Sequence, residues 1–462
     1  MKLNHWIKYL LKYFQTVENK MKKAHQITIS RLFFIIIFLP TLIFGQKNIS
    51  TDLAKYMQAQ VDVNNFSGTV LVSKNGSILL KKAYGLADYE WNVKNTIDTK
   101  FQLASVTKQF TAAAILILVE KGKLSLNDKL NKFLPDYPKA DSVSVHMLLS
   151  HSSGLALGFK ELAISTISAD SAYYEIKKIP YEFPPGTKTA YSNIGYYLLG
   201  KIIEKASGEK YANFLNKNIF EKVGMKNTGI SNNDSIILKK AKVYHLTEKG
   251  LVHNPYINWT FNIGHDGVYS TVEDLALWDK SLYGTTILSA ESKKAMFTSY
   301  SNENWGYGFM INPFYNHGHQ LIAHDGGFFG TMTSFNRYTD DKIFVTVLSN
   351  NESFSHIIGY GLSAIALQKV VELPYKHYQT KIDTTIYDKY VGKYGKNKII
   401  KLNGKLYFNS SEMELLPETK TKFFRADNND RTIEFIEDKK GVYSSIILTK
   451  GGVKETVMKD NQ

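Results

Sequence analysis

The sequence of 462 residues contains no cysteine. This absence excludes disulfide bonds, thiolate metal sites, a cysteine nucleophile and the lipid-modified cysteine of a lipoprotein. Arginine is also scarce, with only four arginines among 57 basic residues, against 42 acidic residues. Proteins that recognise nucleic acids rely on the bidentate guanidinium of arginine. We therefore attribute the formal net charge of +15 to a solvated surface rich in lysine, and we expect no nucleic-acid partner.

The chain also lacks a long hydrophobic run. The longest, residues 32–44, has 13 residues, whereas a helix that spans a bilayer needs about 20 apolar residues. Basic residues precede this run and Gly45 follows it, which is typical of a secretory signal peptide over residues 1–45. An uncleaved membrane anchor and a true start at Met21 are the alternatives. We expect an exported protein, periplasmic or secreted, that meets a membrane only through this segment if the segment stays uncleaved.

Along the rest of the chain, hydrophobic patterns predict strands at both ends with helices between them. Residues 66–85 alternate around Asn75-Gly76, which indicates a β-hairpin, and residues 321–338 and 341–350 also alternate like strands. Helices are predicted at residues 101–122, 124–135, 145–149, 191–205, 272–282 and 357–371. This order predicts an α+β fold, an α/β sandwich in which helices flank an antiparallel sheet.

Beyond Pro374 the pattern changes to short strands separated by turn signals. Strands are predicted at residues 399–402, 405–408, 433–436 and 444–448, and turns at residues 403–404, 428–430 and 451–452. We therefore expect a second, small all-β domain, a barrel or sandwich, over residues 382–462. The larger domain would span residues 46–375, and the joint between the two would lie within residues 372–385.

The first chemically suggestive motif is Ser105-Val106-Thr107-Lys108. Serine and lysine three residues apart lie on one face of a helix. A serine hydroxyl becomes a nucleophile when a nearby base takes its proton, and lysine is such a base when burial lowers its pKa from about 10.4. The apolar residues 112–119 would supply this burial. Ser207 and Lys210 repeat the spacing, but they lie in a polar segment with a glycine, so we set them aside.

Two further motifs carry side chains suited to catalysis. In Tyr191-Ser192-Asn193, the phenol can transfer a proton and the amide can hold a carbonyl. In His324-Asp325-Gly326-Gly327, the glycines permit a close backbone approach and an N–H group for an oxyanion hole. Neither motif is strong evidence alone, because both recur in the chain. Residues 265–267 nearly repeat the second motif. Tyr-x-Asn also recurs at Tyr211, Tyr256, Tyr300 and Tyr407.

Taken together, the order and spacing of these motifs resemble the serine β-lactamase and penicillin-binding-protein superfamily, in particular its class C β-lactamase-like branch. The matching blocks are FQLASVTK (101–108), LLSHSSGL (148–155), PPGTKTAYSN (184–193), GVYSTVED (267–274) and HDGGFFG (324–330). The resemblance covers about residues 51–367. It implies an all-helical subdomain beside the sheet, and the residues after it are similar to the small β domains appended to some members.

The resemblance implies a serine hydrolase that cleaves an amide or ester through an acyl-serine intermediate. Ser105 would be the nucleophile, Lys108 its base and Tyr191 the residue that assists proton transfer. The substrate-binding and oxyanion residues would be Asn193, His324, Gly326 and Gly327, with backbone N–H groups of Ser105 and Gly327 holding the oxyanion. No metal or cofactor is implied, and the partner would be a small-molecule, peptide or ester substrate, including peptidoglycan-derived ones.

One position departs from the family pattern. Many β-lactamases and penicillin-binding proteins carry Lys-Thr-Gly where this chain has His324-Asp325-Gly326, and histidine is largely neutral near pH 7. Loss of the cation would weaken binding of a carboxylate by about 1.5–3 kcal/mol. We therefore expect weak β-lactamase activity and a broader hydrolase, in the range of DD-peptidases, D-aminopeptidases and esterases. The alternatives are a catalytically silent sensor that binds penicillins or muropeptides, and an adhesion role for residues 382–462.

Overall fold

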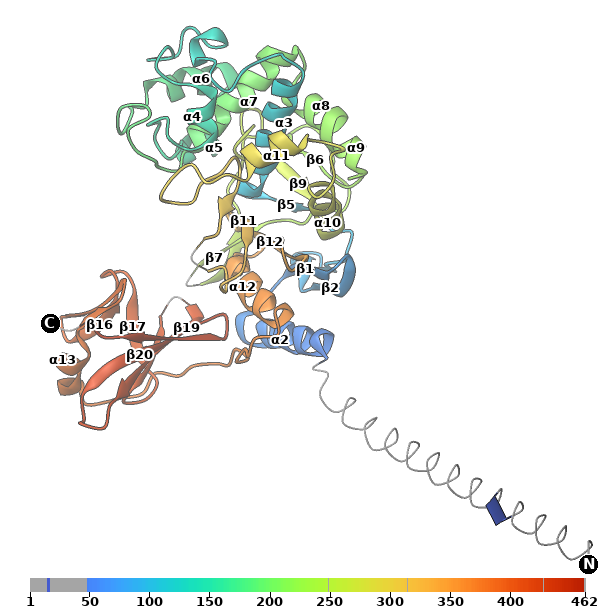
Figure 1. Ribbon diagram of the computed structural model, residues 1–462. Coiled ribbons are helices and arrows are strands. Elements are labelled where there is room, and N and C mark those ends of the chain that lie inside the picture. The colour runs from blue at the N-terminus through green and yellow to red at the C-terminus, as the bar shows by residue number, and fades with distance from the viewer. Residues whose placement is uncertain (1–14, 17–47, 248, 314, 427, 461–462) are drawn as a thin grey trace, which may run out of the picture. The chain divides into compact units, whose positions relative to one another are not determined.

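The computed structural model describes residues 15–16, 48–247, 249–313, 315–426 and 428–460 (Figure 1). The predicted signal segment, residues 1–45, lies outside the described residues except for residues 15–16, so that prediction stays untested. Within the part that the structure describes, no helix is long and apolar enough to cross a membrane.

A six-stranded antiparallel sheet forms the centre of the larger region. In spatial order its strands are β10 (Met310–Ile311), β11 (Leu321–Phe328), β12 (Thr331–Tyr338), β13 (Ile343–Ser349), β1 (Gly68–Lys74) and β2 (Ser77–Tyr84). The predicted hairpin joins β1 to β2 through Asn75 and Gly76, whose φ angles are 52° and 77°. Both residues tolerate the left-handed region that a tight two-residue turn requires, which is why this dipeptide predicted the hairpin correctly.

Alternation along the strands divides the core into two layers. In β13, Val345 and Val347 belong to the cluster that contains residues of α2 (Ile49–Asn64) and α12 (Ser355–Ala366). Their neighbours Phe344 and Leu348 point to the opposite face, where the larger helical core lies. Figure 1 shows α2 and α12 side by side on one side of the sheet and the helices of residues 108–296 gathered on the other. The antiparallel sheet flanked by helices is therefore confirmed.

The helical region packs around one deeply buried helix, α3. Eleven of its thirteen residues are buried, as expected for a helix that is apolar on all sides. The helices of this region are α3 (Lys108–Glu120), α4 (Val145–Leu149), α5 (Lys160–Ala163), α6 (Ala169–Lys178), α7 (Asn193–Ser207), α8 (Tyr211–Leu215), α9 (Glu221–Val223), α10 (Val272–Ser281) and α11 (Ala290–Met296). The region also contains two 3₁₀ turns, η1 (Ala104–Thr107) and η2 (Leu130–Lys132), and one π-helical segment, η3 (Asn216–Phe220).

The helix predicted at residues 124–135 is wrong. Only the short η2 forms there, because residues 125–128 form a turn instead of a helix. In this turn Ser125 N–H donates to Asp128 Oδ2 at 2.8 Å, and Asp128 N–H donates to the Ser125 carbonyl at 3.0 Å. Short polar side chains of this kind compete with helical hydrogen bonds for the backbone.

Short strand pairs connect the helical region to the sheet. They are β3 (Leu86–Asp88) with β4 (Val93–Lys94), β7 (Tyr244–Thr247) with β8 (Gly250–His253), and the three-stranded group β5 (Phe101–Gln102), β9 (Val268–Ser270) and β6 (Gly229–Ile230). In this last group β9 pairs with β5, immediately before η1. It therefore brings residues 264–267 close to the start of α3.

The C-terminal region is an eight-stranded antiparallel sheet. Its strands follow chain order: β14 (Gly392–Tyr394), β15 (Asn397–Leu402), β16 (Lys405–Phe408), β17 (Glu414–Pro417), β18 (Lys422–Arg425), β19 (Asn428–Glu437), β20 (Tyr443–Lys450) and β21 (Val453–Met458). A bridge between Tyr394 and Lys459 joins its two ends, so the sheet is nearly closed. The turn predicted at residues 428–430 is wrong, because β19 begins there. A second, all-β unit is confirmed, preceded by η4 (Thr384–Ile386) and α13 (Tyr387–Tyr390).

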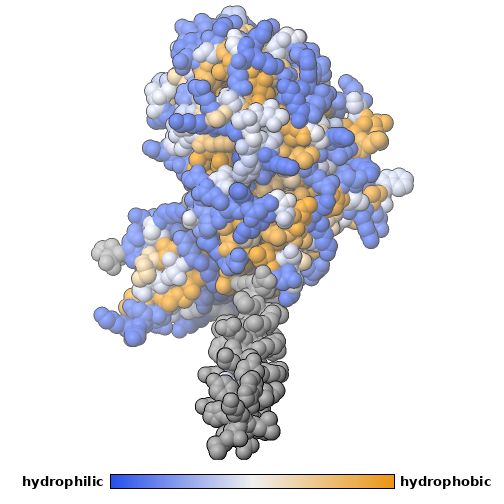
Figure 2. Space-filling model, turned by 45° about the vertical axis from the view of Figure 1, so that its right-hand side comes forward, coloured by the Kyte–Doolittle hydropathy of each residue, from blue (hydrophilic) through white to orange (hydrophobic). Residues whose placement is uncertain are grey.

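The surface agrees with the interpretation of the net charge. On the face drawn in Figure 2, hydrophilic residues surround separate apolar patches. Among the described residues, Lys108 is the only lysine that is fully buried. Most of the excess lysine is therefore solvated, while Lys108 at the start of α3 is fully buried and Lys240 is partly buried.

Candidate active site

Ser105 lies at the entrance of the buried helix. It is the second residue of η1, which runs directly into α3, and Lys108 is the first residue of α3. The predicted one-turn spacing brings Lys108 Nζ to 3.0 Å from Ser105 Oγ. Ala104, just before Ser105, has a φ of 49°, a strained backbone conformation of the kind that often occurs at functional sites.

The ammonium group of Lys108 is surrounded by three oxygen atoms. Besides Ser105 Oγ, Lys108 Nζ donates to Asn193 Oδ1 at 2.8 Å and to the backbone carbonyl of His265 at 2.9 Å. Burial lowers the pKa of Lys108 to about 7, and the negative charge of Asp266 partly opposes this shift. Lys108 therefore changes its protonation state near neutral pH.

Two of these contacts fix the direction of the lysine lone pair. The carbonyl of His265 and Oδ1 of Asn193 are both acceptors, so each requires an N–H from Lys108. In the neutral amine only the lone pair then remains for Ser105 Oγ. The geometry thus allows the neutral amine to accept the proton of the serine hydroxyl.

Tyr191 contacts the same serine from another side. Its hydroxyl donates to Ser105 Oγ at 2.8 Å. Burial raises the pKa of Tyr191, so the phenol stays protonated and acts as a donor. Its ring packs against His151 and Trp305, with centroid distances of 4.6 and 5.1 Å. Asn193 follows at the start of α7, where Ser192 caps the helix by accepting from Gly195 N–H at 3.0 Å.

Strand β11 brings the third motif to the same place. His324 is buried, and burial lowers its pKa to about 3, so its ring is neutral. Its Nδ1 lies 2.6 Å from the carbonyl of Asp325, and since a carbonyl only accepts, the proton is on Nδ1. Within the described residues Nε2 has no hydrogen-bond partner. His324 therefore carries no charge.

The two glycines of this motif have different surroundings. A Cβ on Gly326 would lie 2.3 Å from Thr333 Oγ1 and 2.4 Å from the carbonyl of Leu103. The absent side chain therefore lets β11 pack directly against the residues that precede Ser105. Gly327 is exposed and lines the cleft in front of Ser105. The sequence argument expected both glycines to approach a substrate, but Gly326 approaches the protein's own backbone.

The cleft in front of Ser105 has a volume of about 540 Å³. Its walls are mainly apolar and aromatic, and they come from the segment 157–163 and from the turn between β11 and β12. The apolar lining residues are Leu157, Phe159, Ala163, Phe328, Phe329 and Met332. Phe329 at the β11–β12 turn has a φ of 32°, and Lys160 Nζ lies 4.6 Å from its ring centroid. Such a cleft suits a small ligand with an apolar portion.

Sequence reasoning missed His265 and Asp266. It set residues 265–267 aside as a near copy of the later motif, yet the carbonyl of His265 binds Lys108 and the buried Asp266 interacts electrostatically with Lys108. A backbone carbonyl leaves no signature in a sequence. The one available signal was position, because residues 264–266 immediately precede the matching block 267–274. The set-aside copy at Ser207 lies at the end of α7, away from this cluster.

Comparison with known proteins assigns the family. The beta-lactamase family matches residues 53–367, and penicillin-binding protein 4* of Bacillus subtilis (strain 168) is 30% identical over 436 residues, which cover 85% of this chain and 95% of that protein. The chain belongs to the beta-lactamase family. It is a member of the superfamily of serine β-lactamases and penicillin-binding proteins, as its motifs predicted, and it is thereby placed among the serine hydrolases of that superfamily.

The chain is also similar to two proteins with different names. The teichoic acid D-alanine hydrolase of Staphylococcus aureus is 26% identical over 312 residues, which cover 64% of this chain and 72% of that protein. The octameric penicillin-binding protein homologue from Pyrococcus abyssi has 27% identity and a TM-score of 0.66, and it covers 88% of this chain and 99% of its own. The second match extends beyond the family region into the C-terminal β-sheet.

Proposed function

We propose that this chain is an exported serine hydrolase that cleaves an amide or ester through an acyl-Ser105 intermediate. The observation that carries the proposal is the position of Ser105 Oγ, 3.0 Å from a buried amine and 2.8 Å from a phenol that stays protonated. A serine with a base on one side and a proton donor on the other has the parts that nucleophilic catalysis needs.

Acylation would begin from the neutral form of Lys108. Its lone pair takes the hydroxyl proton as Ser105 Oγ forms a bond to the carbonyl carbon of the substrate. The oxyanion of the tetrahedral intermediate is held by the backbone N–H groups of Ser105 and Gly327. When the bond to the leaving group breaks, the proton passes from Lys108 to the departing nitrogen or oxygen, and Tyr191 assists this transfer.

Deacylation would use the same groups in reverse. A water molecule takes the place of the leaving group, and Lys108 removes a proton as the water oxygen attacks the acyl carbon. The proton then returns to Ser105 Oγ, which releases the acid and restores the enzyme. Asn193 is suited to orient the acyl group, because its Oδ1 is bound to Lys108 and its amide lines the cleft.

Two observations narrow the substrate class: His324 is neutral, and the relatives carry names that indicate cell-wall substrates. His324 supplies no cation, so the carboxylate of a β-lactam finds no charged partner at the position where many relatives have a lysine. One relative is a hydrolase of D-alanine on teichoic acid and others are penicillin-binding proteins. We therefore propose a small peptide, amide or ester substrate, with cell-wall fragments as first candidates and β-lactams as poor substrates.

Covalent labelling tests this proposal. The purified protein is incubated separately with a fluorophosphonate and with a fluorescent penicillin, and the modified peptide is mapped by mass spectrometry. We expect label on the peptide that contains Ser105, and none in Ser105→Ala. Ser207→Ala is the matched control, because Ser207 has the same Ser-x-x-Lys spacing outside the site.

Two results would contradict the proposed enzymatic activity. If neither reagent modifies the Ser105 peptide, or if Ser105→Ala keeps full turnover of an amide and an ester panel, the acyl-Ser105 mechanism is wrong. If Ser105 is labelled but no substrate turns over, the silent sensor becomes the better assignment. Export is tested separately, by N-terminal sequencing of the protein recovered from outside the cytoplasm.

A further inference from the structure

The cleft in front of Ser105 adjoins a second cavity of about 300 Å³. Phe328, Phe329 and Thr331 line both cavities, so the aromatic turn between β11 and β12 separates them. The other walls of the second cavity combine polar and aromatic residues (Gln102, Asn233, Lys240, Asn254, Tyr256 and Trp259) with apolar ones (Ala241, Val243, Pro255 and Ile257). The two cavities are therefore neighbours across the side chains of this turn.

Lys240 supplies the positive charge of this chamber. Its Nζ donates to Ser231 Oγ at 2.8 Å and lies 5.3 Å from the ring centroid of Trp259. Within the described part of the chain this is its only side-chain hydrogen bond, and no carboxylate forms an ion pair with it. Burial lowers the pKa of Lys240 to about 8, so the ammonium form still predominates at neutral pH. Two N–H groups of the ammonium are left for a ligand.

Gln102 adds an amide donor next to this lysine. Its Oε1 accepts from Ser231 Oγ at 2.8 Å, which joins it to Lys240 through one hydroxyl. Gln102 is 4% exposed, and among the described residues no partner lies within hydrogen-bonding geometry of its Nε2. One N–H of this amide stabilises the Asp266 carboxylate, so the other N–H is the one left for a ligand. A buried amide N–H without a partner is costly unless a ligand or water satisfies it.

Asp266 favours the ammonium form of Lys240 through its charge but forms no ion pair with it among the described residues. Its carboxylate accepts the N–H of Gly267 at 2.7 Å and interacts more strongly with Lys108 than with Lys240. The chamber thus combines one ammonium group and one amide donor with aromatic walls. This set matches the two oxygens of a carboxylate, whereas a phosphate dianion calls for more positive charge.

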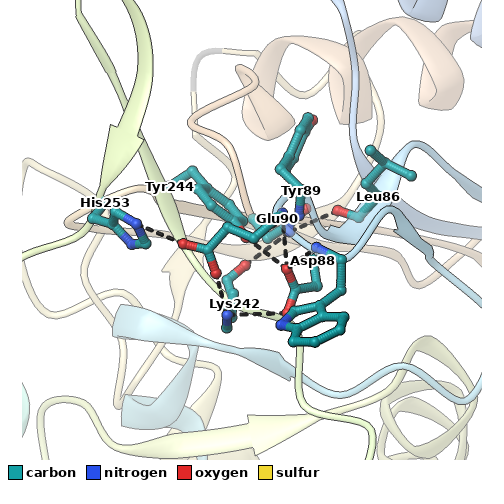
Figure 3. A network of polar contacts seen from close by, with 9 residues as sticks. Leu86, Asp88, Tyr89, Glu90, Lys242, Tyr244 and His253 are labelled. Carbon is teal, nitrogen blue, oxygen red and sulfur yellow. Dashed lines mark hydrogen bonds and ion pairs between the residues drawn. The ribbon is translucent and has the colours of Figure 1, made fainter.

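The segment that carries Lys240 is firmly anchored. Figure 3 shows Lys242 between the carboxylates of Asp88 and Glu90, while His253 Nε2 contacts the second oxygen of Glu90 at 2.6 Å. Lys242 N–H also donates to the carbonyl of Ala87 at 2.9 Å. The backbone next to Lys240 is therefore fixed to the β3–β4 region, and a fixed backbone limits the entropy that Lys240 loses when it binds a ligand.

We propose that Lys240 and Gln102 form a subsite for a carboxylate on the substrate, on the far side of Phe328 from Ser105. The subsite gives this chain a cation for an anionic substrate at a place other than position 324. The inference rests on the proposed hydrolase, and it defines the substrate class more closely: an acyl group with an apolar stem and a terminal carboxylate.

Matched pairs of esters test the subsite. The pairs are 4-nitrophenyl monoesters of glutaric, adipic, pimelic and suberic acid and the 4-nitrophenyl esters of the monocarboxylic acids with the same chain lengths. At neutral pH we expect wild-type kcat/KM to favour the charged member by about tenfold or more at one chain length, since a charge-assisted hydrogen bond has this magnitude. Lys240→Met should abolish the preference by raising KM for the charged ester, and Lys240→Arg should keep part of it.

The controls distinguish the loss of this subsite from misfolding and from a general loss of hydrolytic activity. Lys239→Met changes the neighbouring exposed lysine, which pairs with Asp98, and should keep the wild-type preference. In Lys240→Met, kcat/KM for the neutral esters should fall less than kcat/KM for the charged esters of the same chain length. The preference should also fade as the pH rises above about 8, because Lys240 then loses its proton. An equal preference in wild type and Lys240→Met, or none in wild type at any length, overturns the subsite.

A binding measurement works even without turnover. In Ser105→Ala, titration with adipate and suberate should give a saturable change in tryptophan fluorescence that is lost on adding Trp259→Phe or Lys240→Met. Absence of this signal overturns the subsite. A different result contradicts the proposed hydrolase: either wild type hydrolyses no neutral ester, or Ser105→Ala hydrolyses the neutral esters as fast as wild type. The failure of the subsite and the failure of the hydrolase are therefore distinguishable.

Discussion

The buried carboxylate of Asp266 opposes the effect of burial on Lys108, the residue one helical turn after Ser105. Burial lowers the pKa of Lys108 to about 7, and Asp266 acts in the opposite direction by favouring the ammonium form. The two groups therefore set the pH at which a free amine becomes available next to the serine.

The pH profile of the reaction should report this balance. If Lys108 acts as the base, kcat/KM rises with pH through a pKa near 7. In Asp266→Asn the negative charge is lost, the ammonium form is less favoured, and the rise should move to lower pH by roughly one unit. Glu273→Gln, which removes a carboxylate that binds Lys81 on the surface, is the control and should leave the profile in place. A profile that stays fixed or moves to higher pH in Asp266→Asn contradicts the role of Asp266.

Tyr191→Phe should slow acylation without unfolding the protein. The change removes the hydroxyl that donates to Ser105 Oγ at 2.8 Å but keeps the ring against His151 and Trp305. Loss of one proton-transfer group costs on the order of 10²–10⁴-fold in rate. Stopped-flow measurement of the acylation burst would show the effect, with thermal melting to check the fold.

Tyr300→Phe is the matched control for this experiment. Residues 300–302 repeat the Tyr-Ser-Asn sequence, but the hydroxyl of Tyr300 donates to the carbonyl of Ala295 at 2.9 Å and not to the serine. We expect near wild-type acylation in this variant. A similar loss of rate in both variants, or in neither, would show that Tyr191 has no special part in the reaction.

The sequence was informative wherever chemistry depends on residues close together in the chain. Asn75-Gly76 predicted the first hairpin because its turn needs two left-handed residues, and Ser105 with Lys108 predicted a contact because both lie on one helical turn. The meeting of Tyr191 with Ser105 is a long-range contact, and only the resemblance to a family indicated it.

Other features left no pattern to find. The contact of Lys108 with the carbonyl of His265 involves a backbone atom, and the role of Gly326 depends on a neighbour that is distant in sequence, Leu103. Lys240 could not be distinguished from the other lysines, because its environment is created by folding. The helix predicted at residues 124–135 failed because local side-chain hydrogen bonds favoured turns. For the contact of Lys108, for Gly326 and for Lys240, the tertiary environment decided the outcome.

A buried ion pair next to the central sheet gives a test of stability. Arg337 in β12 is 1% exposed, and its Nε lies 2.5 Å from Asp279 Oδ1 in α10. Asp279→Ala would leave a buried guanidinium without its counter-ion, which costs about 3–5 kcal/mol in the free energy of unfolding. Urea denaturation measures this loss.

The contrast with a surface pair makes this test specific. Glu175→Ala breaks the exposed pair of Glu175 with Lys178, where the expected cost is below about 1 kcal/mol. Replacing both buried partners, Asp279→Ala with Arg337→Met, should recover much of the stability, since no buried charge remains unpaired. An equal cost for the buried and the exposed single variants would show that the buried pair contributes nothing special.

Gly326→Ala should disturb both stability and the position of Ser105. The new methyl group would lie 2.4 Å from the carbonyl of Leu103, so β11 and the start of η1 must separate. Overpacking of this kind costs typically about 1–3 kcal/mol. Because Leu103 precedes Ser105 by two residues, we also expect slower labelling of the serine by a fluorophosphonate. Gly327→Ala is the stability control, as its methyl group would meet only the flexible end of Met332 at 3.2 Å. If Gly326→Ala unfolds at the same urea concentration as Gly327→Ala and Ser105 is labelled as fast as in wild type, the close approach of β11 does not position the serine.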